Sequence, residues 1–202
     1  MKKALVLIIF LTTSASAIAH SGRTDSSGGH NCSSKSQSKG LCSGYHYHNG
    51  TSHTQPAKTT KGYKRDSWKH WSDNDDDCQN TRHEILIRDS STPVKYKSSR
   101  GCKVVSGTWL DPYTNNTYYI ASDVDIDHII PLSYAHKYGG ANWPSGLKEA
   151  FANDTQNLIT VDDSTNQSKG NKPPSKWLPP NRSYHSEYRR RWTALKAKYN
   201  LR

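Results

Sequence analysis

The sequence has few apolar residues and no long apolar run. Only 32% of its 202 residues are hydrophobic, the mean hydropathy is −0.93, and the one continuous apolar stretch is residues 4–11. A membrane-spanning helix needs about 20 consecutive apolar residues, so this composition excludes a multi-pass membrane protein. Six Trp and 12 Tyr argue against a disordered chain. We therefore expect one modest folded domain and a poorly packed segment.

Two further features are scarce or missing. The sequence contains no glycine-rich phosphate loop and no succession of buried parallel strands, which argues against a large cofactor-binding α/β enzyme. Acidic residues are outnumbered, since 17 Asp and Glu stand against 28 Lys and Arg, and the formal charge is +11. This excess indicates a polyanionic partner only weakly, because net charge also serves solubility.

The N-terminus has the parts of a secretory signal peptide. Two lysines precede the apolar residues 4–11, and small residues follow with overlapping A-x-A sites at 15–17 and 17–19. We predict cleavage after Ala19, hence a secreted or periplasmic bacterial protein without a membrane span once the signal is removed. A short membrane anchor is the alternative interpretation.

Four cysteines in an exported chain predict two disulfides. Three pairings are open, and proximity favours Cys32–Cys42 and Cys78–Cys102, because each pair lies inside one region of distinct composition. Thiolate ligation of a metal is the alternative, but the sequence has no C-x-x-C motif and the expected compartment is oxidising.

After the predicted signal peptide at 1–19, the chain divides into three parts. Residues 20–54 form a module rich in Gly, Ser and His, with almost no aliphatic side chains, and residues 55–62 resemble a linker. All six tryptophans fall in residues 63–202, so the core is expected there. We predict an α+β fold for this large domain.

Local patterns within the large domain predict its elements. Strands are expected at 103–110, 117–121, 123–130 and 158–161, and short helices at 133–138, at 145–152 with Ser145 as cap, and after Asp162–Ser164. Residues 82–88 fit either a helix or a strand. A final helix is predicted from one apolar stripe at spacings of three and four: Tyr184, Tyr188, Trp192, Leu195 and Tyr199.

The residues with the clearest chemistry begin near the end of the strand predicted at 123–130. Asp127 is a hard oxygen ligand for a divalent cation, and His128 titrates near neutrality and can take a proton from water. Neighbours on a strand point to opposite faces, so both reach one site only if the chain bends there. Asn166 offers a second oxygen ligand, and Lys169 shares its helix face. This set fits metal-assisted phosphodiester hydrolysis.

These residues resemble the HNH endonucleases, whose site is a ββα-metal (His-Me finger) motif. The motif residues are D-H-I-I-P at 127–131, Asn157 before a short strand, and N-x-x-K-G at 166–170. Flanking blocks are similar to secreted bacterial HNH nucleases related to the GmrSD C-terminal domain: Trp68, 80–86, 104–109, 111–113, 121–132, 151–154 and 177–180. The resemblance covers roughly residues 63–200.

The resemblance implies a role for each matching position. His128 would be the general base, and Asp127 and Asn166 would hold one divalent cation, Mg²⁺ first and Mn²⁺ or Zn²⁺ as alternatives. Asn157 would hold the loop between the strands and so orient His128. The family name places His at the last position, where this chain has Asn166. The segment at 132–156 is longer than in compact members.

Four basic residues are candidate contacts for nucleic-acid phosphates: Arg82, Lys169, Arg189 and Arg190. Arg82 could clamp a phosphate bidentately or pair with an acid such as Glu84 or the run at 73–77. Arg189 and Arg190 lie in a run of three arginines that fans around the last helix, and a solvated basic face is an equally good interpretation.

Residues 20–54 resemble the short YHYH modules of secreted bacterial proteins, with H-x-G-R-T-D, G-G-H and Y-H-Y-H in order. A structural Zn²⁺ site there would use His20, Asp25, His30, His46 and His48. Such a site and a Cys32–Cys42 disulfide would staple a segment that cannot build a core. A flexible tail with one disulfide is the alternative.

Together the patterns predict a secreted, monomeric, metal-dependent HNH endonuclease that cuts DNA, with RNA as a second candidate substrate. Export and the lack of a groove-reading module predict cleavage without sequence specificity. Two alternatives stay open: a nucleic-acid or cell-surface binding protein with an inactive nuclease site, and an antibacterial nuclease toxin with an immunity partner.

Overall fold

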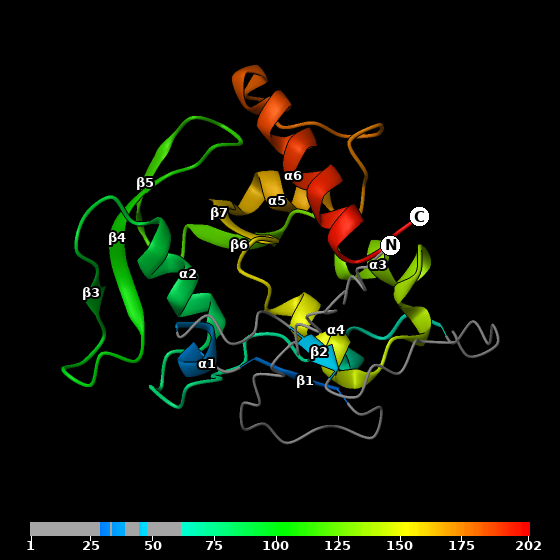
Figure 1. Ribbon diagram of the computed structural model, residues 1–202. Helices are drawn as coiled ribbons and strands as arrows, with labels where there is room; N and C mark the ends of the chain where they lie inside the picture. The colour runs from blue at the N-terminus through cyan, green and yellow to red at the C-terminus, as the bar shows by residue number, and fades with distance from the viewer. Residues whose placement is uncertain (1–28, 33, 39–44, 48–61) are drawn as a thin grey trace, which may run out of the picture.

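The computed structural model describes residues 29–32, 34–38, 45–47 and 62–202 (Figure 1). The predicted signal peptide at 1–19 and the predicted linker up to residue 61 lie outside the described residues. No helix in the described ranges is long and apolar enough to cross a bilayer.

Small antiparallel sheets and short helices follow one another along the described chain. The strands are β1 (Gly29–Asn31), β2 (Tyr45–Tyr47), β3 (Lys95–Tyr96), β4 (Val104–Leu110), β5 (Thr117–Ile120), β6 (Val124–His128) and β7 (Leu158–Asp162). The α-helices are α1 (Ser34–Ser38), α2 (Thr81–Asp89), α3 (Leu132–Lys137), α4 (Ser145–Ala152), α5 (Asp163–Lys169) and α6 (His185–Lys198). Short 3-10 helices are η1 (Arg65–Ser67), η2 (Gly140–Asn142) and η3 (Arg182–Tyr184). This mixture confirms the α+β prediction.

The strands pair in three separate sheets. β1 pairs with β2, β3–β4–β5 form a second sheet, and β6 pairs with β7 in the third. In the third pair His128 lies opposite Leu158, and Val124 lies opposite Asp162. The helix α5 begins directly after β7, so two antiparallel strands and a helix form one compact unit (Figure 1).

Two apolar clusters enclose this unit. One lies between α2, β4 and the β6–β7 pair and includes Ile85, Leu86, Val104, Trp109, Ala121, Val124, Ile126 and Leu158. In Figure 1, α2 correspondingly lies between the three-stranded sheet and the β6–β7 pair. The larger cluster contains Trp68, Ile129, Ile130, Phe151 and the buried face of α6. The β6–β7 pair is therefore held by apolar contacts from both clusters.

Most predicted elements are found, with adjustments at their ends. The stripe on the last helix is confirmed, because Tyr188, Trp192 and Leu195 of α6 are buried. Residues 82–88, whose pattern fits either a helix or a strand, belong to α2. The prediction of Ser145 as cap of α4 is wrong, since Ser145 is the first helical residue and Pro144, at φ −55°, precedes it.

One predicted disulfide is confirmed in the described residues. Cys78 and Cys102 are bonded, which joins the loop before α2 to the start of β4. Cys32 is also disulfide-bonded, and its predicted partner Cys42 lies outside the described residues.

Candidate functional site

A cavity of about 310 Å³ lies at the C-terminal end of β6. Three predicted site residues line it together: Asp127 and His128 from β6, and Asn166 from α5. The other lining residues are Tyr63, Arg65, Ile126, Pro131, Leu132, Ser133, Gly170 and Asn171. The adjacent residues Asp127 and His128 thus reach one space where the strand ends.

Asp127 is buried, and both of its carboxylate oxygens accept hydrogen bonds. The Tyr113 hydroxyl donates to Oδ2 at 2.7 Å, and the Lys169 ammonium donates to Oδ1 at 2.8 Å. Burial raises the pKa of the Asp127 carboxyl, while the charge of Lys169 and the two hydrogen bonds lower it. The carboxylate is therefore fixed in one orientation beside the cavity.

Lys169, a candidate phosphate contact, lies inside the fold. Its side chain is fully buried, and its ammonium donates to Asp127 and, at 2.8 Å, to the main-chain oxygen of His128. Burial lowers the pKa of Lys169, and the Asp127 carboxylate opposes this shift. Lys169 shares a helix face with Asn166, but its ammonium packs against β6 instead of facing a substrate phosphate.

His128 is buried with its imidazole fixed at one nitrogen. Its Nε2 lies 2.7 Å from the Ala152 carbonyl oxygen. Because a carbonyl only accepts, Nε2 carries the proton and Nδ1 keeps a lone pair. Burial lowers the pKa of His128 to about 3, the charges of Arg65 and Lys169 reinforce this shift, and the bond to Ala152 opposes it. The ring is therefore neutral and keeps a lone pair at Nδ1, and its pKa lies below the near-neutral value that the sequence suggested.

The ring of Trp71 packs on that of His128, with a centroid distance of 5.8 Å. This contact and the bond to Ala152 leave the imidazole little freedom to rotate. Trp71 comes from the segment before α2, so residues far from the predicted motif in the sequence position its histidine.

Asn157 is fully buried and fastens the chain just beyond His128. Its Oδ1 accepts a hydrogen bond from the Ile130 amide at 2.8 Å, and its Nδ2 donates to the Ile130 carbonyl at 3.1 Å. Its own carbonyl accepts from the Ile129 amide at 2.8 Å. These bonds fix the turn that leaves β6.

Asn166 is partly buried and points its amide toward β6. Its Nδ2 donates to Asp125 Oδ2 at 3.1 Å, and Asn166 lines the same cavity as Asp127. Carboxylate and amide oxygens are the ligands that hard cations such as Mg²⁺ and Mn²⁺ bind. Each Asp127 oxygen accepts one hydrogen bond and keeps a second lone pair. This set of donor atoms fits a hard divalent cation.

Arg82, the predicted phosphate clamp, is bonded inside the fold. Its guanidinium donates to the Ala121 carbonyl at 3.2 Å and the Val124 carbonyl at 2.9 Å. Its acidic neighbour is Asp125, at 3.9 Å, rather than Glu84 or the acidic run that the sequence suggested. Arg82 thus braces the start of β6.

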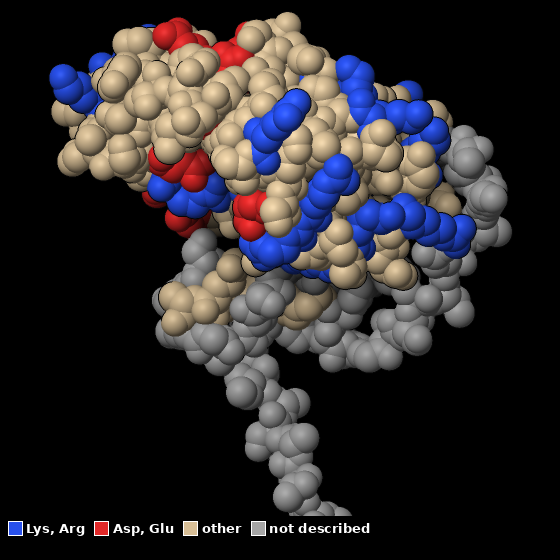
Figure 2. Space-filling model, turned by 90° about the horizontal axis from the view of Figure 1, so that it is seen from above, with Lys and Arg blue, Asp and Glu red and all other residues tan. Residues whose placement is uncertain are grey.

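Arg189 and Arg190 are exposed on α6. Arg190 pairs with Glu187 at 2.6 Å and lines a separate cavity of about 480 Å³ with Arg88, Arg191 and Lys198. Figure 2 views the side on which α6 lies and shows Lys and Arg side chains spread over it, interrupted by smaller acidic groups. This side is basic, as a solvated face or a nucleic-acid surface would be.

Within the predicted zinc module, the structure describes only part of the ligand set. His30 of β1 lies opposite His46 of β2, with ring centroids 4.6 Å apart. The other predicted ligands, His20, Asp25 and His48, lie outside the described residues.

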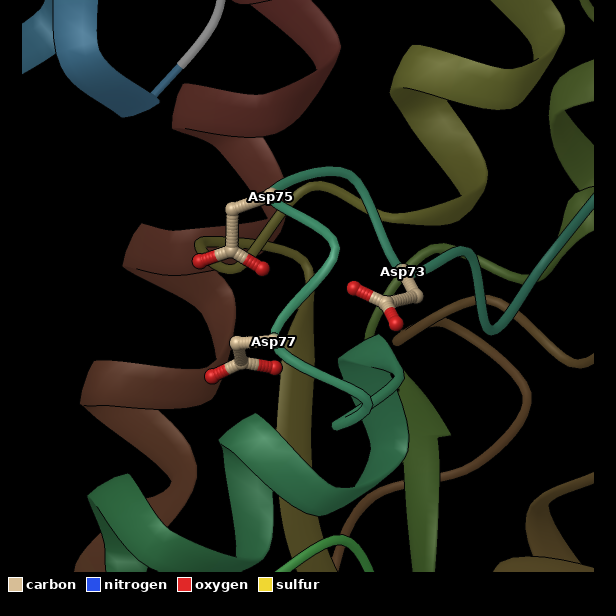
Figure 3. A group of neighbouring side chains, drawn as sticks. All are labelled: Asp73, Asp75 and Asp77. Atoms are coloured by element: carbon tan, nitrogen blue, oxygen red, sulfur yellow. The ribbon is translucent and has the colours of Figure 1, made fainter.

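An exposed acidic group precedes α2 (Figure 3). Carboxylate oxygens of Asp73, Asp75 and Asp77 all lie within 4.8 Å of one another. Two of these side chains also shape the loop, since Asp73 accepts from the Cys78 amide and Asp77 from the Gln79 amide. Exposed carboxylates often gather without binding an ion, and we assign no site to them.

The family described as GmrSD restriction endonucleases, C-terminal domain, matches residues 80–202. This span contains β6, β7 and α5, and therefore Asp127, His128, Asn157 and Asn166. The chain belongs to this family. The nuclease part of the predicted resemblance is thus confirmed.

A protein of Arthroderma benhamiae (strain ATCC MYA-4681 / CBS 112371), described as an uncharacterized secreted protein, is also similar. It is 44% identical over 149 residues, which are 73% of this chain and 71% of that protein. This relative comes from a fungus and gives no support for a bacterial source. No solved structure matches the chain.

Sequence reasoning missed four parts of the site. Tyr113 lies in a turn and Arg65 in the short 3-10 helix η1, neither of which has a periodic pattern, and their contacts depend on the tertiary fold. Trp71 carried only the signal of a core aromatic. The Ala152 partner of His128 is a main-chain oxygen, which leaves no mark in the side-chain sequence.

Proposed function

We propose that this GmrSD C-terminal family member is an exported, metal-dependent HNH endonuclease that hydrolyses DNA, with RNA as a second candidate. The observation that carries the proposal is the shared cavity of Asp127, His128 and Asn166. The order β6, β7, α5 corresponds to that of a ββα-metal motif, which supports the same assignment.

Asp127 and Asn166 would hold the cation, with Mg²⁺ first and Mn²⁺ or Zn²⁺ as alternatives. A divalent cation bound there would polarise the phosphate and stabilise the leaving oxygen. The chain itself orients this ligand pair, because Tyr113 and Lys169 hold the Asp127 carboxylate and Asp125 accepts from the Asn166 amide.

His128 would act as general base through Nδ1. Its Nε2 proton is held by the Ala152 carbonyl, so the imidazole presents a lone pair and takes one proton from water. Asn157 supports this geometry by fixing Ile130, two residues beyond His128. Its role is positioning, since it acts through the main chain.

Export, cleavage without sequence specificity, a monomeric state and a structural Zn²⁺ in residues 20–54 belong to the same proposal. Export rests on the signal-like residues 1–19, and a relative described as secreted supports it. N-terminal sequencing of the secreted protein should begin at His20.

A plasmid cleavage assay with Mg²⁺, Mn²⁺, Zn²⁺ or EDTA tests the reaction. We expect cleavage with Mg²⁺ or Mn²⁺, none in EDTA, and a loss of about 10²-fold or more in His128→Ala, the range typical of general bases. His185→Ala is the matched control, because its Nε2 lies 2.7 Å from the Pro179 carbonyl outside the cavity.

Cleavage that persists in EDTA, or is unchanged in His128→Ala, would contradict this mechanism. DNA binding without cleavage under every metal would favour the binding protein with an inactive site.

A further inference from the structure

The segment before α2 contributes to the cavity although it precedes the family-matched residues 80–202. Tyr63 and Arg65 line the cavity, and Trp71 packs on His128. Trp68, which lies between Arg65 and Trp71 in the sequence, is fully buried, and its ring contacts that of Phe151 at a centroid distance of 5.7 Å. The segment is therefore anchored in the same core as α4, whose last residue holds the His128 ring.

Lys169 and Arg82, two of the predicted phosphate contacts, are bonded elsewhere in the fold. Lys169 is fully buried against Asp127, and Arg82 donates to main-chain oxygens at the start of β6. Neither side chain lines the cavity. A protein cation that contacts the phosphate beside the metal would therefore have to come from another residue.

Arg65 is that residue by position and by charge. It carries the only permanent positive charge among the described residues that line the cavity. It is exposed, and it forms none of the ion pairs found between described residues. It lines the same cavity as His128. A guanidinium that is solvated and near the base is available to a ligand.

We propose that Arg65 binds the scissile phosphate of the substrate. This inference rests on the proposed endonuclease function and adds a contact from outside the family-matched residues. A guanidinium presents parallel N–H donors that match two oxygens of one phosphate, and it stays charged at all relevant pH values. The buried Trp68 anchor holds η1 in place, so this contact is preorganised.

Two substrates test the contact: plasmid DNA and bis(p-nitrophenyl) phosphate, a small diester whose only phosphate is the scissile one. With Mg²⁺ or Mn²⁺, Arg65→Ala should lower kcat/KM by about 10²-fold on both, as loss of one donor to a transition-state oxyanion does. Arg65→Lys should recover part of the loss, because lysine keeps the positive charge but lacks the two parallel N–H donors. Added guanidinium ion should partly rescue Arg65→Ala.

Lys64→Ala is the matched control, because Lys64 is the exposed neighbouring cation and does not line the cavity. It should keep wild-type kinetics on the small diester. Mn²⁺ binding measured by electron paramagnetic resonance should be the same in Arg65→Ala and wild type, which separates phosphate binding from damage to the metal site.

The outcomes separate this inference from the function on which it rests. If wild type cleaves and Arg65→Ala keeps full activity on the small diester, the Arg65 contact is wrong while the endonuclease stands. A loss of activity on plasmid alone would also overturn the contact, since Arg65 would then touch a distant phosphate. If wild type cleaves neither substrate with any metal, both proposals fall.

Discussion

Lys169 and Asp127 form a buried ion pair that connects α5 to β6. The Nζ–Oδ1 distance is 2.8 Å, and the two side chains are 0% and 6% exposed. Lys169 also donates to the His128 carbonyl, so one ammonium holds two consecutive residues of the candidate site. The position of the Asp127 carboxylate and the stability of the domain therefore both depend on the Lys169 ammonium.

Replacing Lys169 by Met should strongly destabilise the protein. The substitution leaves the Asp127 carboxylate buried without its cation, a change that typically costs about 3–5 kcal/mol. In urea unfolding, Lys169→Met should have a lower midpoint concentration of urea than wild type. Arg190→Ala is the control, because the Arg190–Glu187 pair is exposed and such pairs contribute at most about 1 kcal/mol.

The double variant Asp127→Asn/Lys169→Met tests whether the unpaired charge causes this loss of stability. It should be more stable than Lys169→Met alone, because no uncompensated charge stays buried. An unfolding free energy of Lys169→Met within about 1 kcal/mol of wild type would contradict a buried, charged pair.

Replacing Asn157 by Ala should loosen the turn after His128 and lower nuclease activity. The variant leaves the Ile130 amide and carbonyl without partners in the interior, which costs about 1–3 kcal/mol for each group. Hydrogen exchange at the Ile130 amide gives the local readout and should become faster.

Asn181→Ala is a comparison variant, since Asn181 also bonds main chain, at the Pro112 carbonyl, but lies elsewhere. In Asn181→Ala the Ile130 amide should exchange at the wild-type rate. Unchanged Ile130 exchange in Asn157→Ala would show that Asn157 does not fix this turn.

The sequence predicted β4 to β7, the last helix and three residues that line the cavity, Asp127, His128 and Asn166, but not the depth of each side chain. Strand and helix periodicity depends on local spacing, which is why β6, β7 and α6 were found. The same spacing placed Lys169 on the face of Asn166, but whether that face meets solvent depends on the packing of α5 on β6. Arg65 and Tyr113 reach the site through tertiary contacts between segments distant in sequence, which no local pattern encodes.

The cap of α5 should make stability depend on pH in acid. Asp162 accepts from the Thr165 amide and hydroxyl, from Ser164 and from Tyr118. Partial burial raises its pKa, but these donors outweigh the effect and hold it at about 2. The pKa of an Asp in an unfolded chain is about 3.9. The ionised Asp162 cap therefore stabilises the fold fully above that pH, and its contribution is lost as the pH falls toward 2.

The measurement compares wild type with Asp162→Asn by urea unfolding between pH 6 and pH 2. The amide can still cap the helix but does not titrate, so wild type should be the more stable at pH 6 and the difference should shrink below about pH 4. A difference that is constant over this range would refute the lowered pKa.

Arg189 and Arg190 should differ in their contribution to DNA binding, although they are neighbours on α6. Each free cation that neutralises a phosphate adds about 0.9 to the slope of log affinity against log salt. Arg190 is already paired with Glu187, whereas Arg189 is in none of the ion pairs between described residues. Arg189→Ala should therefore reduce the slope by nearly this amount, and Arg190→Ala by clearly less.

The pairing itself supplies the control for this last comparison. Glu187→Gln frees Arg190, so in that background Arg190→Ala should reduce the salt slope about as much as Arg189→Ala does in the wild type. Binding is measured by fluorescence anisotropy on a short duplex with the His128→Ala variant, which is not expected to cut it. If neither arginine changes the slope in either background, α6 presents a solvated basic face, and the substrate backbone must follow another part of the surface.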